Sequence, residues 1–156
     1  MKRGPTNIFD IRLTSEALEE HDECAPAVYG TIRLGDFVET FLAFLSDWSV
    51  EDYQRQWEEA AIRLVDGKTT SAFVTSFESP SRSNHFEWWP CYLLGDMVHF
   101  QNQLKFYEQV PDFDIDKLYE FIGKRRTLSE DGVSPISEWQ VPLSCVRRFL
   151  EKISAS

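Results

Sequence analysis

The stretch "TTSAFVTSFESPSRSNHFEWWPCYLLGDMVHFQNQLKFY" (residues 69–107) decides the fold of this protein. Its apolar residues recur with a period of about two, and it is rich in the β-branched and aromatic side chains that favour β-strands. Two turn signals divide it, the polar run "SPSRSN" at 79–84 and the Gly-Asp pair at 95–96. We therefore predict a meander of three antiparallel strands, at 69–77, 86–94 and 97–107.

The middle strand carries side chains that are also used in catalysis. His85 stands at its start, Glu87 just inside it and Cys91 in its middle, while His99 lies on the next strand. Such residues serve as metal ligands, acid–base groups and nucleophiles. A small hydrolase or metal enzyme that uses these four residues is therefore one hypothesis.

The surrounding sequence favours a structural role for the same strand. The segment "FEWWPCYLL" (86–94) is apolar on both faces, and a buried free cysteine behaves as a small hydrophobe. No HExxH or CxxC motif completes a metal site, and His99 falls on the polar face of its strand, where we expect it to be solvated. We predict a core strand in which Glu87 needs either solvent or a buried partner.

The residues before the meander predict one strand and two helices. "VYGTIRLG" (28–35) alternates and is a possible fourth strand of the meander. "DFVETFLAFLSDW" (36–48) has apolar residues at helical spacing behind Asp36, a possible N-cap. "SVEDYQRQWEEAAIRLVDG" (49–67) has one apolar stripe, a Ser49 cap and a terminal glycine, which indicate an amphipathic helix.

The residues after the meander predict a helix from Asp114 to residue 122, a loop at 123–135, a strand at 136–141 and a helix at 142–154. Helices and antiparallel strands in separate runs are typical of an α+β domain. We expect one sheet of about four to five strands, packed against a single layer of about four helices. The predicted domain spans residues 8–154, and residues 1–7 are expected to be flexible.

The charge restricts the classes of partner. The 156 residues carry a net charge of −10, and residues 1–60 hold 13 acids against 5 bases. A nucleic-acid-binding protein needs the opposite sign to replace phosphate counterions, and an anionic membrane surface would repel this chain. No apolar run reaches the roughly 20 residues of a membrane span, and no signal peptide is recognisable.

The remaining motifs indicate a cytoplasmic protein without a cofactor. The three cysteines, Cys24, Cys91 and Cys145, are odd in number and form no CxxC, which fits a reducing compartment. Neither GxGxxG nor GxxxxGK[ST] occurs, so nothing predicts nucleotide binding.

Acidic residues gather in two stretches. Residues 10–23 contain six acids and one base, and form either a short helix or a solvated loop, while residues 108–116 contain four acids and no base. A solvated face would explain both, but acids also steer basic partners and aromatic rings anchor interfaces. The candidate partner contacts are Glu16, Glu19, Glu20, Asp22, Glu23, Tyr107, Asp112, Phe113, Asp114 and Asp116.

The order of several segments resembles a known family. "YGTIRLGDFVETF", "YQRQWEEAAIRLVDGKTTSAFVTSF", "WWPCYLLGDMVHFQNQLKF" and "DGVSPISEWQVPLSCVRRFL" together resemble bacterial immunity proteins of contact-dependent growth inhibition systems, over most of residues 8–150. The phrases most like the family are "GDFVE", "WWP", "QNQ" and "SEWQVPLS".

The resemblance implies a small, non-enzymatic cytoplasmic inhibitor. It would bind the C-terminal toxin domain of a large secreted effector as a monomer, one to one, and block the toxin active site. Such toxins are often nucleases with basic clefts, which would give the acidity of this chain a physical role. The family supplies no catalytic residues to transfer. Besides the enzyme hypothesis, a peptide-binding adaptor that extends a sheet edge stays open.

Overall fold

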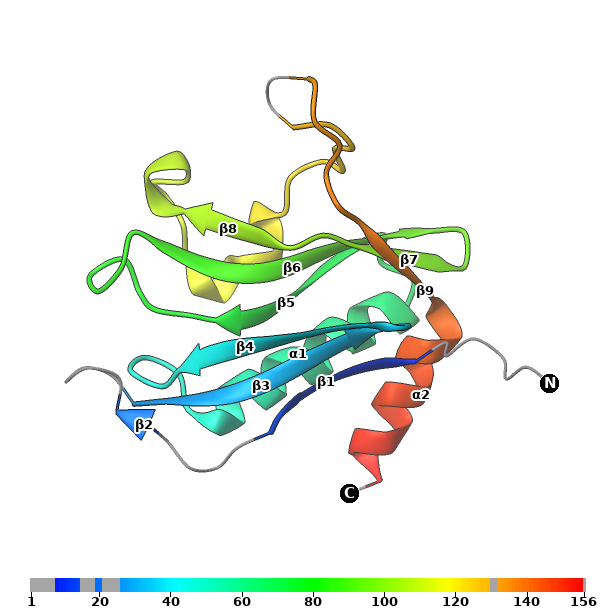
Figure 1. Cartoon of the computed structure of the whole chain (residues 1–156), viewed down its shortest axis with the longest axis horizontal. Coiled ribbons are helices and arrows are strands. Elements are labelled where there is room, and N and C mark those ends of the chain that lie inside the picture. The colour runs from blue at the N-terminus through cyan, green and yellow to red at the C-terminus, as the bar shows by residue number, and fades with distance from the viewer. Residues whose placement is uncertain (1–7, 15–18, 21–25, 130–131, 156) are drawn as a thin grey trace.

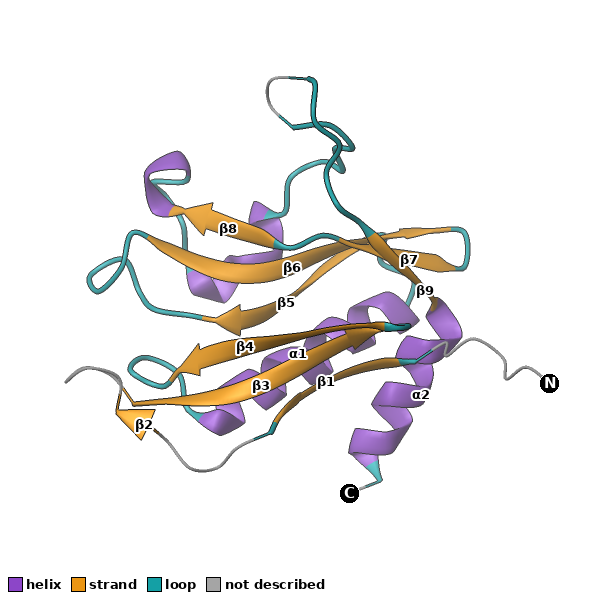
Figure 2. Ribbon diagram, in the orientation of Figure 1, coloured by secondary structure: helices purple, strands orange, loops and turns teal. Residues whose placement is uncertain are grey.

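The computed structural model describes residues 8–14, 19–20, 26–129 and 132–155, and it contains two antiparallel sheets (Figure 1). The sheets lie one above the other in this view, with β4 next to β5, and α1 lies behind β3 and β4 (Figure 2). The predicted α+β class is confirmed. The predicted flexible segment 1–7 lies outside the described residues, as does Cys24.

The first sheet contains β1 (Phe9–Leu13), β2 (Glu19–Glu20), β3 (Pro26–Leu34) and β4 (Phe37–Phe44). The second contains β5 (Thr70–Ser76), β6 (His85–Leu94), β7 (Met97–Phe100), β8 (Gln103–Phe106) and β9 (Trp139–Pro142). The α-helices are α1 (Val50–Val65) and α2 (Leu143–Ser154), and η1 (Tyr107–Gln109) and η2 (Ile115–Phe121) are 3₁₀ helices.

The predicted meander is confirmed, with one interruption. β6 pairs with β5 on one side and with both β7 and β8 on the other. β7 and β8 share one register along β6, whereas the register with β5 shifts between Val74 and Ser76. The predicted strand 97–107 is divided into β7 and β8 at the position opposite Pro90. The Gln101 N–H donates to the Pro90 carbonyl (3.0 Å), but proline has no N–H to return the bond, so the ladder is broken there.

The helix predicted at 36–48 is wrong, because residues 37–44 form β4. β4 pairs along the whole of β3 from Leu34–Phe37 to Ala27–Phe44, and Gly35 makes the tight turn between them with φ 66°. Both strands belong to a separate sheet, so 28–34 is not a fourth strand of the meander. The apolar residues of 37–44 have only approximate helical spacing, and their hydrogen bonds to β3 stabilise a strand instead.

Helix α1 confirms the prediction for 49–67 and closes the outer edge of β5. The Val74 N–H donates to Gln56 Oε1 (2.8 Å), and Gln56 Nε2 donates to the Ala72 carbonyl (2.8 Å). The Trp57 indole N–H donates to the Val74 carbonyl (2.7 Å). The backbone groups of β5 that do not bond to β6 are therefore hydrogen-bonded by side chains of α1. The outer edge of β5 is thus closed to a peptide strand.

Aromatic rings join the two sheets and α2 into one core. The Phe9 ring of β1 lies 5.2 Å from that of Phe73, 5.3 Å from that of Phe100 and 5.1 Å from that of Phe149, measured between centroids. These rings come from both sheets and from α2. The side chains that can meet a partner are therefore those at the rim of this core and on its outer faces.

Candidate functional site

The four side chains of the enzyme hypothesis do not form a site. Cys91 is fully buried and desolvation raises the pKa of its thiol, so the nucleophilic thiolate is disfavoured. The His85 ring packs against Phe106 and its Nδ1 lies 2.7 Å from Asn84 Oδ1. Throughout the described ranges, no group of three or more His, Cys, Asp or Glu side chains is placed to hold a metal ion.

His99 is buried, with an exposed fraction of 9%, so the expectation that it is solvated is wrong. Its Nδ1 lies 3.5 Å from Glu138 Oε1. Glu138 is also held by Arg125, whose Nε and an Nη donate at 2.8 and 2.7 Å, and by Gln101 Nε2 at 2.9 Å. This cluster fastens the loop before β9 to β7 and is a structural feature.

The first acidic stretch falls largely outside the described residues, which is where Glu16, Asp22 and Glu23 lie. For Glu19 and Glu20 the backbone is described, as β2, which pairs with Ala27 and Pro26 of β3. Their side chains are not among those described. The alternative of a short helix does not hold for these two residues, since they form a strand.

The second acidic stretch presents its carboxylates to solvent. Asp112, Asp114 and Asp116 are exposed, and Asp114 Oδ1 accepts the Asp116 N–H (3.0 Å) at the start of η2. The two rings behave differently. Tyr107 is buried and its hydroxyl donates to the Glu78 carbonyl (2.5 Å), while Phe113 is half-buried against neighbouring rings. Both rings support the acidic loop from beneath.

A groove of about 390 Å³ lies between α1 and η2. It places Asp116 beside acids of α1 that the sequence did not connect with it. Asp116 lines it together with Asp52 and Glu59 of α1, and Arg55 lies among them. The carboxylate of Asp52 is already engaged, since it caps α1 and pairs with Arg55 at 2.9 Å. This groove is acidic, but part of its charge is neutralised internally.

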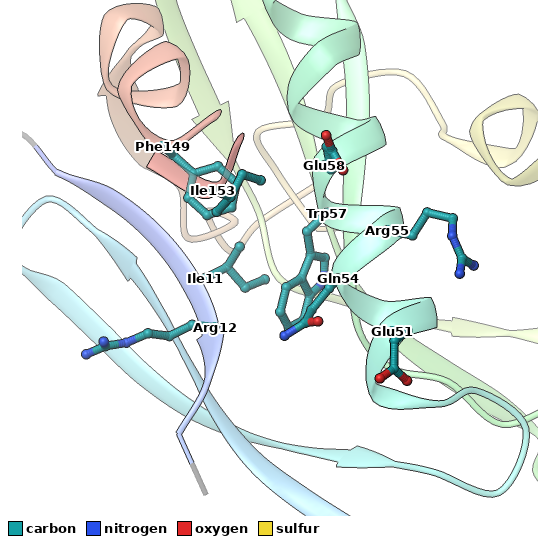
Figure 3. A pocket seen from close by; sticks show the side chains of 9 residues that line it. All are labelled: Ile11, Arg12, Glu51, Gln54, Arg55, Trp57, Glu58, Phe149 and Ile153. Carbon is teal, nitrogen blue, oxygen red and sulfur yellow. The ribbon is translucent and has the colours of Figure 1, made fainter. Parts of the chain in front are cut away.

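A second groove, of about 460 Å³, lies between β1, α1 and α2 (Figure 3). Ile11, Trp57, Phe149 and Ile153 gather at its floor, whereas the Arg55 and Arg12 side chains point outward from its rim in this view. Glu51 and Glu58 complete the rim, so the charges balance. This arrangement suits an apolar group without preference for either sign of charge.

The described residues thus form an α+β fold with solvent-facing grooves, and the candidate catalytic side chains are buried or apart. Residues 43–149 match the family model of the CdiI N-terminal domain. The chain belongs to this family, the CdiI immunity proteins of contact-dependent growth inhibition, and is not an enzyme.

Two relatives from Enterobacter cloacae agree with this assignment. The immunity protein CdiI of E. cloacae subsp. cloacae is 30% identical over 124 residues, which cover 80% of this chain and 85% of that protein. The solved CdiA-CT/CdiI toxin and immunity complex from E. cloacae contains a chain of similar fold, with a TM-score of 0.84 and 27% identity. The match covers 96% of this chain and all of that one.

Proposed function

We propose that this protein binds and neutralises the cognate C-terminal toxin domain of a contact-dependent growth inhibition effector. The observation that carries the proposal is the similarity, over 96% of the chain, to a chain of a solved toxin and immunity complex. The complex would form one to one in the cytoplasm of the producing cell. No helix in the described residues is both long and apolar enough to cross a membrane.

The mechanism we propose is occlusion of the toxin active site by an acidic surface. A net charge of −10 would speed and orient encounter with a basic domain, such as a nuclease, whose cleft must hold phosphates. Among the predicted contacts, Asp112, Asp114 and Asp116 are exposed and fit this role. Glu16, Glu19, Glu20, Asp22 and Glu23 stay predicted contacts, and Tyr107 and Phe113 would hold the acidic loop in place.

The test is co-expression with the toxin domain encoded by the neighbouring effector gene. We expect this protein to restore growth of cells that make the active toxin domain, and to co-purify with a catalytically inactive form of it. The matched control is a toxin domain from an unrelated effector, which it should neither bind nor neutralise. Absence of both binding and rescue with the neighbouring domain would refute the proposal.

A further inference from the structure

A third groove, also of about 460 Å³, lies at the junction of the two sheets. Its walls come from the last residues of β4 and β5, the first residues of β6, and β8, which meet where the arrowheads of β4, β5 and β8 end in Figure 1. We call it the junction groove and define it by Leu42, Phe44, Glu78, His85, Glu87 and Leu104.

The apolar side chains of the junction groove are partly open to solvent. Leu104 of β8 is 47% exposed, and Leu42 and Phe44 of β4 are half-buried. Apolar surface that remains exposed beside polar groups is characteristic of interaction sites.

Among the described residues, the carboxylates at this groove form no direct ion pair, although Arg82 and His85 lie near enough to Glu78 to lower its pKa in part. Glu78, Glu87 and the neighbouring Glu39 form no ion pair within 4.0 Å with any basic side chain in the described part of the chain. Glu87 accepts one hydrogen bond, from Asn102 Nδ2 (3.0 Å). Burial raises the pKa of Glu39, and the nearby Glu87 charge raises it further. Glu39 and Glu87 are therefore close enough to repel each other, and Glu87 lines the groove together with Glu78, so a bound cation would be favoured there.

The wall that carries Glu78 is fixed before any partner binds. Asp47 holds the turn between β5 and β6, since its Oδ2 accepts the Ser79 N–H (2.9 Å) and its Oδ1 accepts Arg82 Nε (3.2 Å). The Tyr107 hydroxyl bonds the Glu78 carbonyl from the other side. A preformed wall reduces the conformational entropy lost on association.

We infer that the junction groove takes a lysine- or arginine-bearing segment of the toxin domain, an inference that rests on the proposed function. The apolar stem of such a side chain would pack against Leu42 and Leu104. Its charged tip would meet the carboxylates of Glu78 and Glu87. A guanidinium can also stack on the Phe44 ring. The groove in Figure 3 is a poorer site for a cation, because two arginines stand at its rim.

The test compares two variants of equal charge change, with the inactive toxin domain of the neighbouring effector as the probe. Glu39→Gln/Glu78→Gln/Glu87→Gln removes the two charges that line the junction groove and the charge of Glu39, which interacts with Glu87. The control is Asp66→Asn/Asp96→Asn/Glu151→Gln, which removes three exposed charges that line neither this groove nor the groove in Figure 3. We expect the groove variant to raise the Kd at least about 30-fold and the control to raise it less than about 3-fold.

A second variant covers the case in which the triple variant does not fold. Leu104→Lys changes an exposed position and places a cation where we expect the partner's own, so the Kd should rise at least about 10-fold. If the wild-type protein neutralises the toxin while the groove variants bind as tightly as wild type, this inference is wrong and the proposed function stands. If the wild-type protein does not bind the toxin domain, the proposed function itself fails.

Discussion

Glu138 and the carboxylates of the junction groove are the same chemical group, but they differ in their hydrogen-bond donors and nearby charges. The Glu138 side chain is 13% exposed and is bonded by Arg125 and Gln101. Its pKa is lowered, first by the hydrogen bond from Arg125 and against the effect of burial. The pKa of Glu78 is instead raised, first by burial and then by Asp47, which outweigh Arg82 and His85.

The difference separates a carboxylate that supports the fold from carboxylates that cost the fold free energy. A buried charge with a complete set of donors is stabilised in its ionised form, whereas one with few donors is not. Carboxylates that destabilise the isolated fold are expected at a functional site, where a bound partner supplies the missing donors. The comparison can be tested in the absence of the toxin.

The largest effect is expected at Glu138. Glu138→Gln keeps the shape of the side chain but removes the charge that Arg125 bonds, and the free energy of unfolding should fall by about 1–3 kcal/mol. Urea denaturation measures it. Glu120→Gln, an equal change at an exposed position, should be within about 0.5 kcal/mol of wild type. Equal stability of the Glu138 variant and wild type would mean that the cluster contributes nothing net.

A smaller effect of opposite sign is expected at the junction groove. Glu39→Gln/Glu78→Gln/Glu87→Gln should leave the free energy of unfolding unchanged or raise it by up to about 1 kcal/mol, because mutual repulsion and the burial of charge are relieved. The same urea titration gives the answer. A clear loss of stability would show that these acids are structural, and the contrast with Glu138 would not stand.

The smallest effect is a difference in pH dependence. Both kinds of carboxylate have an ordinary pKa of 4.5. The stability from Glu138 is fully present above that value and is lost as pH falls through its lowered folded pKa. The cost of Glu39 and Glu78 is fully present above their raised folded pKa and is relieved as pH falls toward 4.5.

Urea midpoints measured from neutral pH downward should therefore separate the two variants. Between neutral pH and 4.5, the advantage of the groove variant over wild type should shrink, while the deficit of Glu138→Gln should hold steady. Below 4.5 that deficit should shrink in turn. Parallel pH profiles for both variants would contradict the assignment of opposite pKa shifts.

Two identical dipeptides illustrate how much of the fold could be predicted. Gly95-Asp96 and Gly35-Asp36 both form tight turns, with glycine φ of 65° and 66°. The first was predicted because alternating segments flank it. The second was missed because residues 37–45 carry apolar side chains on both faces, a pattern that fits a helix equally well.

The candidate sites were less predictable than the strands. Sequence reasoning found the acids that are clustered along the chain, such as Asp112, Asp114 and Asp116. Glu39 is far in sequence from Glu87, and the two interact only because β4 approaches the second sheet, where Glu87 lines the junction groove with Glu78. Glu87 was recognised as a residue that needs solvent or a partner, but the residues that surround it could not be named without the sheet register.

The closure of the β5 edge by α1 also has a consequence for biosynthesis. α1 lies immediately before β5 in the chain, so the helix leaves the ribosome before the strand that it protects. Gln56 and Trp57 are therefore already available when the Ala72 and Val74 backbone groups emerge. The interval in which this apolar strand could pair with a strand of another nascent chain is thereby kept short.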